Sequence, residues 1–317
     1  KRQINSTREF IDLTSKSNTE GTSNKVFTAD FTAMFTSLKQ DTILKSLFEL
    51  TEFCFKNAMN SGGHKYINIK GTKSYYSQKM SDRHCYDKSS VLEMIYDQVK
   101  NSYVTFAGFN FLQTQGTAMG SNCSTSIADC CLIWHEYTFL RKCPKSLARS
   151  LNFSARYCDD YFCASTLPNS EIQAVLDDIY PKELELEITS TSETEATFLD
   201  TSIRMENGRI RLHVYNKTDD FNFTVIRYSS ACSLVHSSLG YRTFFGELHR
   251  FAYICSKSKD FQNVVKNAVI SFTNNGFDKC KLLFQLLKFC QTKSLFAAKF
   301  ELRTEKDIQN FIREAIQ

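Results

Sequence analysis

The sequence lacks a hydrophobic segment long enough to cross a membrane. Its longest apolar runs, such as Cys130–Trp134, are far shorter than the ~20 residues that a membrane helix needs. Lys1 opens directly into polar sequence, without the apolar stretch of a secretory signal. The absence of a membrane-spanning run predicts no membrane partner, and the intracellular location that we expect rests on the cysteines described next.

Cys-x-x-Cys pairs, the spacing typical of metal and redox sites, are also missing. The twelve cysteines are scattered through 317 residues, and none of them forms a Cys-x-x-Cys motif. A disulfide framework is typical of small secreted chains, so we expect buried thiols in a reduced protein. A zinc site could be drawn from Cys54, His64, His84 and Cys85, but two tight ligand pairs are lacking, and this alternative is not favoured.

The chain has no strong overall charge, yet its charge is unevenly placed. The net charge is +5, and residues 201–317 hold 18 Lys+Arg against 10 Asp+Glu, a balance of +8. A basic C-terminal part indicates a polyanionic partner, with an ordinary solvated helical surface as the alternative. At 36.5 kDa the chain exceeds the usual size of a single core, which predicts two or three subdomains.

Apolar periodicity predicts an α+β body followed by a helical domain. Asp41 is expected to cap a helix that runs to about Met59, and Asn207-Gly208 is a strong hairpin turn. From Thr243 onward the period is helical throughout. Further helices are predicted over residues 6–13, 90–100, 121–140 and 170–179, and extended segments over 26–38, 65–70, 103–112, 153–164, 184–189 and 197–204.

Two adjacent acids, Asp159 and Asp160, occupy a turn between apolar runs within Phe153–Ala164. Like charges raise each other's pKa unless a cation lies between them. A plain surface turn is the alternative, because Asp also serves local hydrogen bonding there.

A third acid, Asp30, ends an apolar strand. A hairpin tip and a neighbouring strand end can bring three carboxylates together on hard cations. We therefore expect two Mg²⁺ ions, or Mn²⁺ in their place, ~3.5–4 Å apart, which would stabilise both oxygens of a phosphoryl displacement.

A glycine-containing loop, Gln113–Ser121, leads into a helix. Gly116 and Gly120 would allow the backbone to approach a base or a phosphate closely. A simple helix-start loop is the alternative for this segment taken alone.

Taken together and in this order, these three segments resemble the reverse transcriptase of Penelope-like retroelements, a group whose polymerase is similar to that of telomerase. Asp30 fits motif A, Gln113–Ser121 fits motif B, and Arg156–Asp160 fits motif C. The resemblance spans roughly residues 4–284. It extends to Phe198–Ile203 and Val214–Thr218, although Thr218 follows Lys217 without the usual proline, and to His236 and Arg250–Ser256, which are similar to the family's thumb.

The resemblance implies an RNA-directed DNA polymerase with an α+β right-hand fold. We expect partial fingers in residues 1–25, a palm in 26–218 with a fingers insertion at about 60–112, and an all-helical thumb in 219–317. One antiparallel palm sheet should combine residues 26–38, 153–164 and 184–217, with helices 40–59 and 121–140 on one face. Only 29 residues precede Asp30 and no Gly-Ile-Tyr nuclease follows the thumb, so a separate chain or missing segment would supply the fingers.

The resemblance also implies roles for individual residues. The catalytic residues would be Asp30, Asp159 and Asp160, and Phe31 would join them in binding metal. Phe35 would pack under the sugar and exclude a 2′-hydroxyl, which favours dNTPs over NTPs. Nucleotide contacts would further come from Gln113, Gly116 and Lys182, and contacts with the RNA template and DNA primer from Met119, Gly120, Ser121, Lys217, Arg227, Arg242 and Arg250.

Two other functions stay open at this point. The chain could be a non-catalytic RNA-binding subunit of a ribonucleoprotein with a reverse-transcriptase fold, or an RNA polymerase, which Phe35 disfavours. For location we expect the nucleus first, with a mitochondrion or a ribonucleoprotein particle as alternatives.

Overall fold

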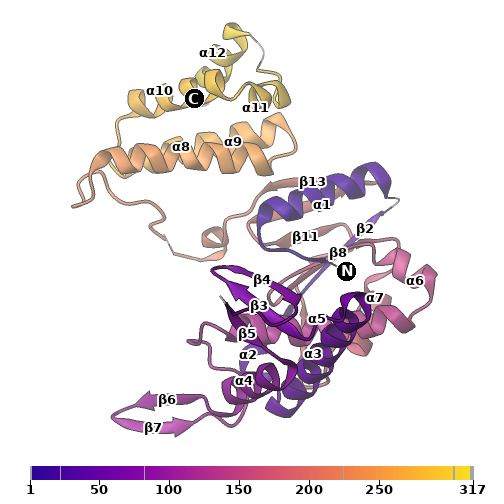
Figure 1. Ribbon diagram of the computed structural model, residues 1–317. Coiled ribbons are helices and arrows are strands. Elements are labelled where there is room, and N and C mark those ends of the chain that lie inside the picture. The colour runs from indigo at the N-terminus through magenta and orange to yellow at the C-terminus, as the bar shows by residue number, and fades with distance from the viewer. Residues whose placement is uncertain (1, 22, 82, 224, 303, 315–317) are drawn as a thin grey trace. The chain divides into compact units, whose positions relative to one another are not determined.

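The computed structural model describes residues 2–21, 23–81, 83–223, 225–302 and 304–314. They form two compact units, shown together as ribbons in Figure 1. The first unit comprises mainly Ala29–Asn152 and Leu167–Ile188, and the second comprises Arg2–Thr28, Phe153–Thr166 and the chain from Thr189 onward. Over the ranges just given, no helix is long and apolar enough to cross a membrane.

Helices dominate the first unit. Two of them, α4 and α5, pack against the long helix α3. Asp41 does not cap α3, which begins at Gln40 with Lys39 as its N-cap. Asp41 lies instead in the first turn and accepts an ion pair from Lys100 at 2.8 Å. The six helices of this unit are α2 (Met34–Ser37), α3 (Gln40–Gly62), α4 (Lys88–Lys100), α5 (Ser124–Lys142), α6 (Lys145–Ser150) and α7 (Asn169–Ile179).

Two small sheets complete the first unit. One has the strand order β4-β3-β5, from β3 (Tyr66–Lys70), β4 (Lys73–Ser77) and β5 (His84–Tyr86). The other is a hairpin of β6 (Tyr103–Phe106) and β7 (Phe109–Leu112), which confirms an extended segment there. Ala107 and Gly108 turn the hairpin with φ values of 50° and 81°.

A five-stranded sheet has the order β1-β8-β9-β2-β10. The strand β2 begins in the second unit, and its last three residues belong to the first, where they pair with β10. The predicted hairpin over residues 153–164 is confirmed as β8 and β9. The strands are β1 (Arg2–Gln3), β2 (Lys25–Phe31), β8 (Phe153–Tyr157), β9 (Asp160–Ser165) and β10 (Leu186–Ile188).

A separate three-stranded sheet follows, so the expected single palm sheet is wrong. It consists of β11 (Glu195–Phe198), β12 (Thr201–Glu206) and β13 (Arg209–Val214). The strand predicted over 197–204 is broken, because Leu199 adopts a left-handed φ of 55° and reverses the chain. The Thr201 hydroxyl, which donates to the Phe198 carbonyl at 2.7 Å, closes this turn. The Asn207-Gly208 turn is confirmed between β12 and β13.

The C-terminal part of the second unit, from Ser237 onward, is helical, as the periodicity from Thr243 predicted. The unit also contains the N-terminal helix α1 (Thr7–Glu20), which precedes β2. Helices α8 and α9 lie side by side and pack on β13 (Figure 1). Helix α8 begins at Ser237, six residues before Thr243, because the His236 ring accepts a bond from the Ser238 amide and caps it. The C-terminal elements are η1 (Lys217–Asp220), α8 (Ser237–Ile254), α9 (Ser258–Asn274), α10 (Lys279–Thr292), α11 (Ser294–Lys299) and α12 (Glu305–Glu314).

One hydrophobic core runs through the second unit. It joins Phe10 of α1 and Ile203 of β12 to Phe244 of α8 and Phe272 of α9, all of them fully buried. The C-terminal helices therefore fold on the β11–β13 sheet and not as an independent body. All twelve cysteines are free, but only four of them are buried, and the expectation of buried thiols is wrong for the exposed Cys123, Cys232 and Cys280.

Candidate active site

The hairpin β8–β9 presents the two adjacent acids. Tyr157 pairs with Asp160, so Cys158 and Asp159 form a two-residue turn. Cys158 has a φ of 51°, a left-handed conformation that is unfavourable for a residue with a side chain. Such strain clusters at functional sites, where the surrounding structure enforces it. The turn is therefore held in an uncommon shape at the place that the sequence analysis singled out.

A buried arginine braces this turn. Arg156 is 0% exposed, and its Nη1 donates to the Cys158 carbonyl at 2.7 Å. On the other side, the Ile4 amide donates to the Arg156 carbonyl at 3.0 Å. These two bonds hold the backbone of the turn in place. In the sequence, Arg156 stood out only as part of motif C. Its charge within a largely buried strand was the signal that could have pointed to a structural role.

Asp30 is the last but one residue of the buried strand β2. It is half-buried and lies opposite Glu187 of β10. Phe31 is 2% exposed, and its ring packs edge-on against Tyr180 with centroids 4.7 Å apart. Metal binding by Phe31 could therefore use only its backbone oxygen. Two residues later, Ala33 has a φ of 51° and turns the chain into α2.

The motif B loop lies against the segment that follows Asp30. The Gly116 amide donates to the Leu38 carbonyl at 3.0 Å, and the Thr117 amide to the Phe35 carbonyl at 2.8 Å. Gly116 has a φ of 71°, and a Cβ added there would lie 2.3 Å from the Phe35 oxygen. Only glycine fits this contact. The predicted role of Gly116 in close backbone approach thus has a partner inside the protein.

A groove of about 610 Å³ opens beside this contact. Four residues predicted to bind nucleotide or nucleic acid line it together: Gln113, Met119, Gly120 and Ser121. Met119 is the most accessible, with 73% of its surface exposed. The wall is completed by residues to which the sequence assigned no contact: Thr36, Thr117, Ala118, Ser102, Tyr103 and Val104. The uncharged, aromatic composition just before motif B was the signal that could have pointed to the last three.

Two predicted nucleotide-binding residues have other settings. Gln113 braces its own loop, because its Nε2 donates to the Gln115 carbonyl at 2.8 Å while Gln40 donates to the Gln113 carbonyl at 2.9 Å. Lys182 lies exposed in the turn between α7 and β10, outside the lining of the groove. Its contact with the nucleotide stays a prediction.

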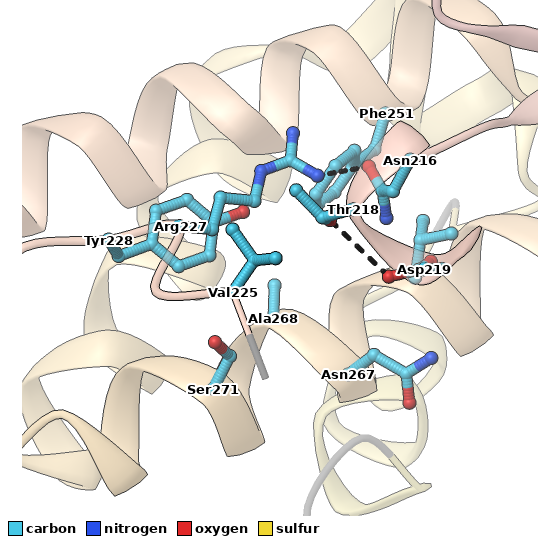
Figure 2. Close-up of a pocket in the computed structure, with 11 residues that line it drawn as sticks. Asn216, Thr218, Asp219, Val225, Arg227, Tyr228, Phe251, Asn267, Ala268 and Ser271 are labelled. Carbon is cyan, nitrogen blue, oxygen red and sulfur yellow. Dashed lines mark hydrogen bonds between the residues drawn. The ribbon is translucent and has the colours of Figure 1, made fainter. Parts of the chain in front are cut away.

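The predicted basic contacts of the second unit fall into two kinds. Arg250 pairs with Asp200 at 3.1 Å and with Glu247 at 2.9 Å. Arg227 pairs with Glu247 at 3.4 Å and donates to Asn216, the upper dashed line of Figure 2. By contrast, Lys217 on η1 and Arg242 on α8 are exposed.

A small cavity of about 190 Å³ adjoins Arg227 (Figure 2). Its wall includes Tyr228, whose pKa is raised to about 12 by burial and by the nearby Glu247 carboxylate. Tyr228 therefore stays protonated and can donate its hydroxyl to Glu247 at 3.3 Å. Arg227 and Arg250 serve this internal network, which leaves Lys217 and Arg242 better placed for an external phosphate.

Within the described ranges, no three His, Cys, Asp or Glu side chains form a group that could hold a metal ion. Asp30 belongs to the first unit, and Asp159 and Asp160 belong to the second. The metal site predicted from the sequence is therefore taken up below as a proposal.

Comparison with known proteins identifies the fold. No family model and no curated protein matches the chain. Among solved structures, it is similar to telomerase from Candida albicans in complex with a TWJ fragment of telomeric RNA, with a TM-score of 0.53 and 15% identity over 99% of this chain and 52% of that one. Apo telomerase from Candida tropicalis matches with a TM-score of 0.42 and 14% identity over 99% and 51%. The chain thus spans about half the length of these structures, and its fold, mixed α and β with antiparallel sheets, is similar to that of the C. albicans telomerase.

Proposed function

We propose that the chain is the catalytic part of an RNA-directed DNA polymerase of the Penelope-like type, acting in the nucleus. The observation that carries the proposal is the β8–β9 turn. It is strained at Cys158, braced by buried Arg156, and presents Asp159 and Asp160 on a strand that neighbours β2. A structural turn needs neither two adjacent acids nor a buried arginine that holds its backbone.

Contacts within the second unit support convergence of the third acid on this turn. The Asn24 amide donates to the Ser165 carbonyl at 3.3 Å, and the rings of Phe27 and Tyr161 lie 6.2 Å apart. Advancing along β2 thus matches receding along β9, as in antiparallel strands. The same register continued by three residues would bring Asp30 level with Asp159. We propose that these carboxylates form one cluster.

Such a cluster suits two Mg²⁺ ions, or Mn²⁺, because its donors are all carboxylate oxygens. When bound, the ions would stabilise the attacking and leaving oxygens of the transfer. Asp30 and Asp159 would hold both ions, and Asp160 would tune the charge. Arg156 would keep the turn in place during the reaction.

The groove at motif B would receive the templating base pair and the incoming dNTP. Phe35 would lie under the sugar, and Gly116 would fix the loop against it through the backbone bonds described above. Met119, Gly120 and Ser121 would contact the template RNA, and exposed Lys217 and Arg242 the primer–template backbone. The C. albicans telomerase was solved with RNA, which supports an RNA partner here.

Primer extension on an RNA template with Mg²⁺ tests the proposal. We expect incorporation of dNTPs in preference to NTPs, and its loss in Asp159→Asn. Asp12→Asn, on an exposed position of α1, is the matched control and should extend as the wild type does. A wild-type chain that binds RNA but extends no primer would instead identify a non-catalytic RNA-binding subunit, and a preference for NTPs an RNA polymerase.

A further inference from the structure

The β6–β7 hairpin carries an exposed apolar face. All eight residues of its two strands are exposed. In Figure 1 the ribbon of β6 and β7 projects away from the helices of the first unit. Val104 pairs with Phe111 and Phe106 with Phe109, so these four side chains share one side of the hairpin. Their exposed fractions are 49%, 54%, 73% and 69%. We call this surface the hairpin face.

The opposite side of the hairpin is different. There the Thr105 hydroxyl donates to the Asn110 side chain at 2.8 Å, and Tyr103 and Leu112 form the next cross-strand pair on that side. No third strand joins β6 and β7 among the residues whose positions are given. A lone two-stranded hairpin is marginally stable in water, and exposed strands with apolar faces invite further contacts. The hairpin face is therefore built to be covered.

Charge is absent from this part of the chain. No Asp, Glu, Lys or Arg occurs from Asn101 to Leu112, the segment that forms the hairpin, although 23% of all residues are charged. Sites for single-stranded nucleic acid combine aromatic side chains with a positively charged groove. The cores of protein interfaces are instead rich in aromatics and poor in charge. The composition thus favours a protein partner over RNA.

We propose that the hairpin face docks on the same face of a second copy of this chain, across a two-fold axis. In such a contact each residue meets the partner's equivalent surface, so any charge would face its like. A neutral face avoids this repulsion in a chain with a net charge of +5. The inference concerns the first unit alone, and of the four residues of the hairpin face only Val104 also lines the motif B groove.

The available area is sufficient for such a contact. Three phenylalanines and a valine, about half to three-quarters exposed, offer roughly 500 Å² per copy, because a Phe side chain buries 150–250 Å². Covering the face on both copies would remove roughly 1,000 Å² from water, the lower limit of a specific interface. A reversible dimer is therefore expected, in which eight apolar side chains pack between two hairpins.

Sedimentation equilibrium with charge-swap variants tests the proposal. The wild type should shift with concentration from 36.5 kDa towards twice that mass. Phe109→Lys and Phe109→Glu should each stay monomeric, because identical charges would meet across the axis. An equimolar mixture of the two variants should recover at least half of the wild-type dimer. Phe284→Lys, at a 62% exposed position of α10, is the matched control and should dimerise like the wild type.

Three outcomes would overturn the proposal. A wild-type chain that stays monomeric at about 100 µM would show that the area is too small to hold two copies. Equal dimerisation of the wild type and Phe109→Lys would place the interface elsewhere. If the wild type is monomeric and binds a fluorescent oligo(U) RNA that Phe109→Ala no longer binds, the hairpin face is an RNA site. Because Phe109 is exposed, circular dichroism should show the same folded content in every variant.

Discussion

At the scale of single residues, the proposed active site depends on how the turn after Tyr157 is held. Cys158 takes a left-handed conformation, and the Arg156 side chain holds its carbonyl at 2.7 Å. A lysine would keep the positive charge but lose the planar fork of the guanidinium. The two contributions of Arg156, geometry and charge, can therefore be separated by substitution.

We expect Arg156→Lys to lower kcat for dNTP incorporation roughly tenfold to a hundredfold while KM changes little, since small misplacement of catalytic groups is costly. Adding Cys158→Gly should restore much of kcat, because glycine adopts a φ of 51° without strain. Single-nucleotide kinetics of both variants, with thermal melting as a folding check, provide the measurement. Absence of rescue would indicate that Arg156 acts through its charge.

A second residue, Phe35, should decide the sugar. Phe35→Ala should raise NTP incorporation relative to dNTP, because the ring would otherwise fill the volume of a 2′-hydroxyl. Its backbone bond to Thr117 does not involve the side chain, so the motif B loop should stay in place. Loss of even ~2–3 kcal/mol of discrimination changes the ratio of kcat/KM values about a hundredfold. An unchanged ratio with activity retained would make Phe35 a packing residue only.

At the scale of elements, one glycine joins the motif B loop to the segment after β2. Gly116→Ala should destabilise the first unit by more than ~1 kcal/mol, because alanine is strained at a φ of 71° and its Cβ would clash with the Phe35 carbonyl. Primer extension should fall with it, since the loop must move. Gly120→Ala is the control, because no atom lies within 4 Å of an added Cβ there. Thermal melting that ranks the two variants equally would contradict this role of Gly116.

Helices α3 and α5 meet at a histidine that makes stability depend on pH. His135 bonds Ser46 at 3.0 Å, and burial lowers its pKa below 6.5. The unfolded chain therefore takes up this proton first as pH falls, so the stabilisation is full above about pH 6.5 and declines below it. Burial also lowers the pKa values of His213 and His249.

We expect His135→Gln to reduce the loss of melting temperature between pH 7.5 and pH 5.5, a range chosen to span the ordinary pKa of histidine, about 6.5. His84→Gln, at an exposed position of β5, should lose as much as the wild type. Equal slopes for the two variants would show that the α3–α5 contact does not carry the pH dependence.

At the scale of the whole molecule, charge should govern binding to a primer–template duplex. The balance of +8 in residues 201–317 predicts affinity that falls as salt rises. Arg242→Gln should reduce the slope of log K against log salt by about 1, the loss of one phosphate contact. Arg227→Gln should leave the slope nearly unchanged, because that guanidinium already pairs with Glu247. Equal effects on the slope would show that the internal pairing does not exclude Arg227 from the duplex.

The sequence by itself determined the local elements and the order of the acidic and glycine motifs. The apolar runs on both sides of Asp159 and Asp160 predicted the hairpin of β8 and β9, and Asn207-Gly208 predicted the hairpin of β12 and β13. The 3.6-residue period predicted the C-terminal helices. These features depend on the φ preferences and the solvent exposure of residues close in the chain. Such preferences are encoded locally, so they can be read without knowledge of the fold.

Only the tertiary structure decided which distant segments meet. The close contact of Gly116 with Phe35 results from packing between residues far apart in the chain. The bond from Arg156 to Cys158 is short in sequence, but the complete burial of Arg156 depends on the fold around β8, which pairs with β1 and β9. The exposed hairpin face is the converse case. The sequence predicted an extended segment there, and only the fold shows that its apolar side is uncovered. Contacts of this kind depend on the sum of many long-range interactions, which no local pattern contains.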